Sequence, residues 1–232
     1  MAEKVKKKAK QVEAEIEEFE GSGGIASRLE EFVLGNRTLS LSILGGAVAI
    51  VLGLLGFRYI QQSQDGEAQT EMFQAIYYSQ QDSTSLALNG DQTNLGLLDI
   101  VSDYSGTSTA NQAALLAGIN FLKEGDAGSA IEYLEKFADD GSMLTMSKYA
   151  ALGFAYQETG DQGAAARSFE KAANRPQTNK ETTPFWLLHA GQAYEAAGDA
   201  GKALNLYQEI KQEYPLSFEA GTIDKYIGRV GG

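Results

Sequence analysis

The longest uncharged stretch of the chain runs from Thr38 to Phe57 and is mostly Leu, Ile, Val, Ala and Gly. At about 1.5 Å rise per residue, such a stretch forms a helix that spans the ~30 Å hydrocarbon core of a bilayer. The pattern predicts a single transmembrane helix over residues 38–60.

Two alternatives to an anchor are a secretory signal and a buried helix of a soluble domain. A signal has a short basic lead, about 7 to 15 apolar residues and a small-residue cleavage site. Here 37 residues precede the stretch, and Arg58-Tyr59-Ile60-Gln61-Gln62 follows it. Nothing else in the chain is apolar enough to surround a buried helix of this kind. An uncleaved anchor is therefore favoured.

Small residues recur along the predicted anchor at spacings of four and three. On a helix they form one stripe, where a second helix backbone could approach closely. The members of this stripe are Ser42, Gly46, Ala49, Gly53 and Gly56. Gly and Ala are also frequent in membrane helices that lack such a partner, so a specific helix contact and an ordinary composition both stay open.

Residues 1–24 begin with lysines and continue with glutamates, an order that opposes the helix macrodipole. We predict a flexible cytoplasmic tail here, whose lysines either contact anionic lipid headgroups or RNA or are simply solvated. In residues 25–36, apolar side chains recur at helical spacing. This pattern predicts a short amphipathic helix on the membrane surface.

Helical periodicity returns after the anchor, in Glu67–Gln80 and Asn94–Tyr104, with a polar loop predicted over Asp82–Gln92. Further on, a Gly-Asp-x-Gly-x-Ala motif begins at residues 125, 160 and 198. Its first Gly can end one helix in the left-handed conformation, its Asp can cap the next, and its Ala permits close helix packing. The motif therefore predicts a series of helix pairs.

We place three repeats at about 111–142, 146–177 and 184–215, with a capping helix at 217–230. Two further sequence features mark helix starts. Thr109-x-x-Gln112 matches a capping box, and Thr183-Pro184 matches a cap followed by a first helical residue.

The repeats resemble tetratricopeptide repeats (TPRs), which have a period of about 34 residues and the pattern W-x2-L-G-x2-Y, A-x3-F, P. The middle repeat matches at Tyr149, Leu152, Gly153, Tyr156, Ala165, Phe169 and Ala172; the last at Gly191, Tyr194, Ala203, Tyr207 and Pro215; the first, more weakly, at Gly118, Phe121, Ala130 and Leu134. The expected fold is all-α: one N-terminal transmembrane helix followed by a TPR-like α-solenoid over 65–232.

The sequence offers no catalytic constellation. The chain has no cysteine and one histidine, His189, so no second imidazole or thiolate could complete a metal site. We expect no enzymatic activity, no cofactor, no metal and no small-molecule substrate.

The TPR resemblance implies a concave groove that holds a peptide. Carried over by register, the groove residues are Leu115, Ile119, Leu122, Ala150, Phe154, Gln157, Leu188, Gln192 and Glu195. The alternative is that several of them pack internally and that a neighbouring segment, such as the 67–80 helix, closes the groove.

Charge is divided unevenly along the chain. Residues 1–60 hold eight basic and eight acidic residues, whereas residues 61–232 hold 11 and 23, a net charge of −12. This acidity argues against nucleic-acid binding by the larger part. Basic residues precede the anchor, while only Arg58 follows it before Lys123, so the positive-inside rule predicts a cytoplasmic N-terminus and a translocated domain.

The layout also resembles the YfgM-like family, an ancillary subunit of the bacterial SecYEG translocon. The matching motifs are Arg28-x-x-Glu31-Phe32, Asn36-Arg37 and Gly56-Phe57-Arg58-Tyr59. This resemblance implies a single-pass inner-membrane protein with a periplasmic TPR domain, and as partners the SecYEG translocon and a periplasmic peptidyl-prolyl isomerase chaperone. The tail over 1–24 is longer than that family leads us to expect. The alternative is a structural scaffold of another inner-membrane complex, such as a respiratory, secretion or cell-division machine.

Overall fold

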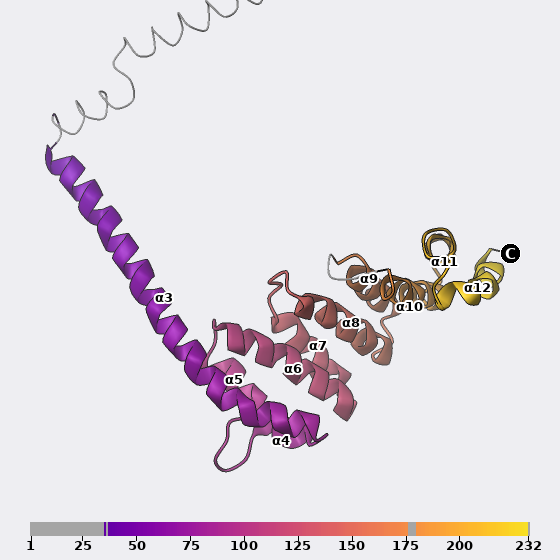
Figure 1. Ribbon diagram of the computed structural model, residues 1–232, viewed down its shortest axis with the longest axis horizontal. Helices are drawn as coiled ribbons and strands as arrows, with labels where there is room; N and C mark the ends of the chain where they lie inside the picture. The colour runs from indigo at the N-terminus through magenta and orange to yellow at the C-terminus, as the bar shows by residue number, and fades with distance from the viewer. Residues whose placement is uncertain (1–34, 36, 176–179, 232) are drawn as a thin grey trace, which may run out of the picture. The chain divides into compact units, whose positions relative to one another are not determined.

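The computed structural model describes residues 35, 37–175 and 180–231, and every regular element in these ranges is helical (Figure 1). The chain forms two compact units, residues 1–60 and residues 61–232. The tail predicted over 1–24 lies outside the described residues, as does the amphipathic helix predicted over 25–36 except for Gly35.

The first unit contains the start of helix α3, Arg37–Gln80. Every side chain from residue 41 to residue 60 is exposed, and within 41–80 the helix is long and apolar enough to cross a membrane. Soluble proteins rarely leave so much contiguous apolar surface in water. This helix is therefore a candidate membrane span. The structure also joins the two segments predicted as helices, 38–60 and 67–80, into one.

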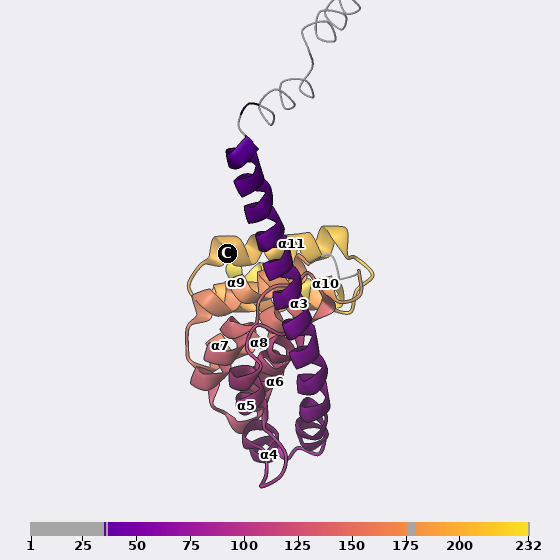
Figure 2. The same ribbon diagram turned by 90° about the vertical axis from the view of Figure 1, so that its left-hand side faces the viewer.

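The second unit is a stack of short helices in which neighbours in sequence are neighbours in space (Figures 1 and 2). After α3 come α4 (Thr84–Asn89), α5 (Leu97–Asp103), α6 (Ser108–Glu124), α7 (Ala127–Lys136), α8 (Met143–Glu158), α9 (Gln162–Ala173), α10 (Thr183–Ala196), α11 (Ala200–Glu213), the 3-10 turn η1 (Glu219–Gly221) and α12 (Ile223–Val230). Such nearest-neighbour packing defines a solenoid. With the apolar helix, it confirms the predicted fold class.

The Gly-Asp-x-Gly-x-Ala motif forms the turn within each helix pair, as predicted. Each first glycine has a left-handed backbone, with φ of +78° at Gly125, +84° at Gly160 and +82° at Gly198. Each aspartate then accepts a hydrogen bond from a backbone N–H in the next helix: Asp126 from Ser129 (3.0 Å), Asp161 from Ala164 (2.8 Å) and Asp199 from Lys202 (3.1 Å). The closing alanines 130, 165 and 203 are fully buried.

Each helix pair packs closely where the first helix carries a glycine. A Cβ on Gly153 would lie 2.4 Å from the Phe169 ring, and one on Gly191 would lie 2.4 Å from the Tyr207 ring. Real Cβ atoms essentially never come that near another heavy atom. These glycines let the aromatic side chain of the second helix lie directly on the backbone of the first.

Neighbouring repeats are joined by hydrogen bonds from a tyrosine to a glutamate. Tyr156 on α8 donates to Glu135 on α7 (2.8 Å), and Tyr194 on α10 donates to Glu170 on α9 (2.6 Å). Burial, together with the nearby carboxylate, raises the pKa of both phenols to about 12. Both hydroxyls therefore remain protonated donors at neutral pH.

Both ends of the stack are covered. At one end, residues 61–80 of α3 bury Ala68, Met72 and Ala75, and Asp65 accepts a hydrogen bond from the backbone N–H of Thr109 (2.8 Å). At the other end, α12 buries Ile223 in the cluster formed by α9, α10 and α11. Capped ends of this kind keep a solenoid soluble.

Several local predictions need correction. The loop expected over Asp82–Gln92 contains the short helix α4, because Ala87 and Leu88 are buried against α5 and α6. The cap of α6 is Thr107, whose hydroxyl accepts from Ala110 N–H, since Thr109 itself bonds to Asp65.

Helix α10 begins one residue earlier than predicted. Its N-cap is Thr182, so Thr183 already lies within the helix. The capping element expected over 217–230 is the turn η1 followed by α12.

Candidate protein-binding surface

The residues predicted to form the groove lie on the first helices of the three pairs, α6, α8 and α10, and their environments differ. On α6, Leu115 is buried among Leu134, Phe137 and Leu152, and Ile119 and Leu122 pack partly against the same cluster. Leu115 therefore contributes to the core between neighbouring repeats instead of offering surface. On α8, Ala150 is also buried.

On α10, the two polar residues of the predicted set are bonded to neighbouring helices. Gln192 donates to the Tyr226 hydroxyl (3.1 Å). Glu195 accepts from the Tyr207 hydroxyl (3.1 Å) and pairs with Arg229. The hydrogen bond from Arg229 lowers the pKa of Glu195. In this part of the surface the covering segment is α12, not the 67–80 helix.

The centre of the surface carries an aromatic cluster, which we define as Phe154, Phe169, Phe185, Trp186 and His189. Phe154 meets the rings of Phe169 and His189 edge-on, at centroid distances of 5.0 and 5.5 Å. Phe185 meets Trp186 and His189 in the same way, at 4.7 and 4.5 Å. Edge-on contacts between rings stabilise the fold more than the area that they bury would by itself. The rings of the aromatic cluster therefore hold one another in place.

Two members of the aromatic cluster reach the surface. Phe154 is 37% exposed and Phe185 is 40% exposed, while Phe169 is fully buried beneath them. Leu188, the other apolar residue of the predicted set on α10, is partly buried beside them, and Gln157 is half-buried. Exposed aromatic side chains on a rigid support are typical anchors in protein interfaces.

The polar atoms of the aromatic cluster have few partners. The indole N–H of Trp186 is buried and finds no hydrogen-bond acceptor among the described residues. Burial lowers the pKa of His189 although the charge of Glu219 opposes this shift, so the imidazole is neutral at pH 7. An electrically neutral aromatic surface suits an uncharged, apolar segment of a partner.

Sequence reasoning selected Phe154 and Leu188 but missed Phe185 and Trp186. The available clue was the i, i+4 spacing of Phe185 and His189, which places both rings on one face of α10. The packing of His189 against the rings of Phe154 and Phe185 explains its position without a metal.

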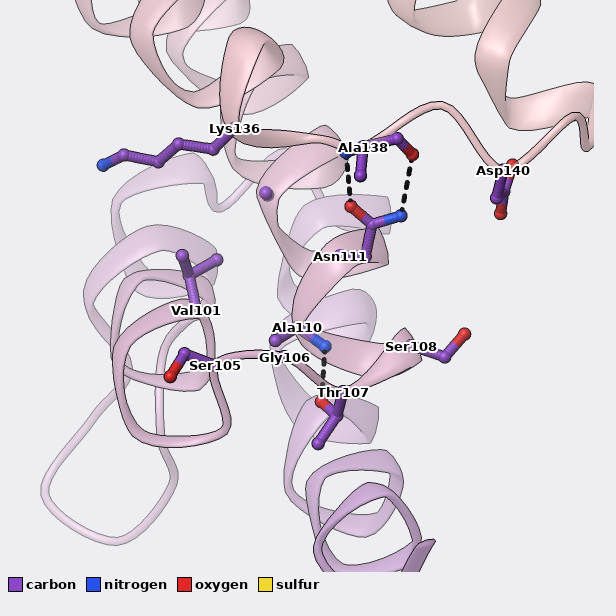
Figure 3. Close-up of a pocket in the computed structure, with 11 residues that line it drawn as sticks. Val101, Ser105, Gly106, Thr107, Ser108, Ala110, Asn111, Lys136, Ala138 and Asp140 are labelled. Carbon is purple, nitrogen blue, oxygen red and sulfur yellow. Dashed lines mark hydrogen bonds between the residues drawn. The ribbon is translucent and has the colours of Figure 1, made fainter. Parts of the chain in front are cut away.

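A hollow of about 550 Å³ lies between α5, α6 and α7 (Figure 3). Asn111 bridges it by two hydrogen bonds to the backbone of Ala138, donating at 3.1 Å and accepting at 2.7 Å. Lys136 extends along the rim, where it pairs with Glu132 (2.8 Å). These bonds hold the α7–α8 loop against α6. The polar residues around the hollow therefore have a structural role.

Neither a metal centre nor a partner for the small-residue stripe is found in the part of the chain that the structure describes. No group of three or more His, Asp or Glu residues gathers there. The stripe residues Ser42, Gly46, Ala49, Gly53 and Gly56 are all exposed, and a Cβ on any of its glycines would meet nothing within 4 Å.

Comparison with known proteins supports the repeat assignment. Residues 187–217 match the model of the tetratricopeptide repeat family, and no curated protein matches the chain. A solved structure of nearly identical TPR-like repeats from a Podosopora anserina kinesin light chain, carrying one substitution, superposes with a TM-score of 0.53. The two are 14% identical, and the match covers 72% of this chain and 85% of that one.

At such low identity the likeness concerns the fold alone. TPR folds generally serve as non-enzymatic scaffolds that bind other proteins. The stacked helix pairs, the capped joints and the matched repeat together identify residues 61–232 as a TPR-like solenoid, a fold that indicates a protein–protein interaction module.

Proposed function

We propose that the chain is a membrane-anchored interaction module that binds a polypeptide on its aromatic cluster. The observation that carries this proposal is the pair of exposed rings, Phe154 and Phe185, on a buried aromatic support. The apolar start of α3 supplies the anchor. The rings would pack against apolar side chains of the partner.

The motifs around the anchor support a finer proposal. Their resemblance to the YfgM-like family favours an ancillary subunit or chaperone adaptor of the Sec translocon in a bacterial inner membrane. In that setting, residues 61–232 lie on the periplasmic side, and the surface receives a peptidyl-prolyl isomerase chaperone or an emerging chain. The distribution of Lys and Arg around the anchor supports this orientation.

The second candidate is a structural scaffold for another inner-membrane complex. The exposed small-residue stripe on α3 favours this alternative, because such stripes let helices pack closely in lipid. Replacing Gly46 and Gly53 by Leu would then dissociate the complex, whereas changing Phe154 and Phe185 would leave it intact. The translocon proposal expects the aromatic residues to matter for partner capture.

Two measurements test the anchor and its orientation. An integral protein stays in the membrane pellet at alkaline pH and is released by detergent. Protease added after permeabilisation of the outer membrane should degrade residues 61–232 while the inner membrane is intact. Release into the alkaline supernatant would refute the anchor, and protection until the inner membrane is opened would refute the orientation.

Site-specific crosslinking tests the surface. A photoreactive phenylalanine analogue at position 154 or 185 should capture a translocon subunit or periplasmic chaperone in intact membranes. Leu216 is fully exposed but lies outside the aromatic cluster, so the same analogue at position 216 is the matched control. Capture of the same proteins from all three positions would count against a specific surface, and capture of respiratory, secretion or division proteins alone would favour the scaffold.

A further inference from the structure

A second cleft, of about 380 Å³, opens between α7, α8 and α9 on another face of the solenoid. Helix α7 contributes Glu135, α8 contributes Lys148 and the apolar floor, and α9 contributes Arg167 and Lys171. Its full lining is Glu135, Lys148, Tyr149, Leu152, Tyr156, Ala164, Arg167, Ser168 and Lys171.

The cleft and the aromatic cluster lie on opposite sides of α8. Leu152 and Tyr156 line the cleft and are each two residues from Phe154, which at 3.6 residues per turn is about 200° around the helix axis. A ligand in the cleft therefore does not compete for the exposed ring of Phe154.

The charge of the cleft is opposite to that of the domain around it. Three cations and one carboxylate line the cleft, whereas residues 61–232 as a whole carry 11 basic and 23 acidic residues. The carboxylate, Glu135, is already occupied as the acceptor of the Tyr156 hydroxyl. The cleft is therefore a positive site on a negative surface.

Neighbouring groups hold the cations in place. Lys148, with 12% of its side chain exposed, donates to the Phe137 carbonyl (2.8 Å) and pairs with Asp139 (3.2 Å). The Nζ of Lys171 lies 5.0 Å from the centre of the Tyr149 ring. Such a cation–π contact orients a cation without neutralising it.

Two of the cations lack an acidic partner. Within the described residues, neither Arg167 nor Lys171 has a carboxylate at ion-pair distance. The guanidinium of Arg175 also lies 4.6 Å from the centre of the Tyr149 ring. It pairs with Asp139 (3.0 Å), as Lys148 does.

We propose that the cleft between α7, α8 and α9 binds an acidic polypeptide segment of a partner, with its carboxylates on Arg167 and Lys171 and its apolar side chains against Tyr149. A long polyanion such as a nucleic acid would be repelled by the surrounding acidic surface, whereas a short acidic segment can stay within reach of Arg167 and Lys171. The inference depends on the proposed function only in taking the ligand to be a polypeptide.

Fluorescence anisotropy with the full-length chain in mild detergent tests the proposal. The probe is a fluorescein-labelled peptide containing three Glu-Ala-Glu-Leu units, and its control has Gln in place of Glu. The acidic peptide should bind, more weakly as salt rises because exposed charges are screened, and the Gln peptide should not. The double variant R167Q/K171Q should weaken binding about tenfold, equivalent to ~1.4 kcal/mol.

Matched variants separate the cleft from general electrostatics. K202Q/K225Q makes the same charge change on α11 and α12 and should leave the affinity within about twofold, as should the charge-preserving variant R167K/K171R. Equal binding of the two peptides, an equal loss in K202Q/K225Q, or displacement by millimolar inorganic phosphate alone would overturn the proposal. Crosslinking from position 154 should persist in R167Q/K171Q, so failure of the cleft is distinguishable from failure of the proposed function.

Discussion

The same substitution, Gly to Ala, should have opposite effects at two positions of the last repeat. At Gly191 a new Cβ would lie 2.4 Å from Cε1 of Tyr207, a fully buried ring. At Gly201, in the first turn of α11, the nearest atom would be the Asp199 Oδ1, at an ordinary 3.9 Å. Both changes replace a poor helix former by the best one.

The expected magnitudes follow from these distances. Replacing Gly by Ala within a helix stabilises it by up to ~1 kcal/mol, and we expect this gain at Gly201. At Gly191 the gain is opposed by overpacking, which typically costs ~1–3 kcal/mol. The net effect there is a destabilisation of roughly 0–2 kcal/mol, so the two variants should differ by about 1–3 kcal/mol.

Thermal unfolding of the full-length chain in mild detergent, followed by circular dichroism at 222 nm, measures this difference. For a domain of this size 1 kcal/mol shifts Tm by about 2–4 °C, so G201A should melt ~2–12 °C above G191A. The pair G163A and G153A repeats the comparison in the middle repeat, because a Cβ on Gly163 would meet the flexible end of Arg167 at 3.4 Å and the Asp161 Oδ1 at an ordinary 3.6 Å. If G191A were as stable as G201A, close backbone packing would not be the reason for glycine at that position.

Three further results are expected from thermal unfolding. Asp161→Ala should destabilise the chain by about 1 kcal/mol because α9 loses its cap, while Asp161→Asn, which keeps an acceptor, should cost less; equal losses would contradict the capping role. The pKa of Asp199 is held below its ordinary 3.8 by hydrogen bonds from the Lys202 side chain and backbone, so its contribution is complete above about pH 4 and is lost as pH falls further. Tm should therefore fall in acid less steeply for Asp199→Asn than for the unmodified chain, and identical profiles would refute this. Ile223→Ala should cost about 2–4 kcal/mol because Ile223 is 1% exposed, whereas Leu216→Ala, at a fully exposed position, should cost almost nothing; comparable losses would show that α12 does not cap the stack.

The sequence predicts the fold well where one residue type has one local role. Gly125, Gly160 and Gly198 end helices and the aspartates after them cap the next, as the backbone shows. Such features need only local chemistry. Helix α4 was missed because six residues are too few to show a period, and Ala87 and Leu88 became helical through contacts with distant helices.

The candidate surface was harder to predict from the sequence. The position of a residue within its repeat shows which face of the helix it lies on, but not whether another segment covers that face. Phe154 is exposed, whereas Leu115, another member of the predicted groove, is buried. Gln192 and Glu195 are bonded to Tyr226 and Arg229, more than 30 residues further along the chain. The positive cleft also brings together residues from α7, α8 and α9, and no linear motif marks it.

The tyrosine–glutamate bonds between neighbouring repeats have a consequence for the alignment of one helix pair on the next. Two helix pairs that slipped along their axes would still bury alanine against alanine. A slip would also leave the Tyr194 hydroxyl, on a residue only 5% exposed, without the Glu170 carboxylate that accepts its hydrogen bond. An unsatisfied buried hydroxyl costs about 1–3 kcal/mol. Because Tyr156 and Glu135 form the same bond at the preceding joint, these contacts fix the register of neighbouring repeats and not their order.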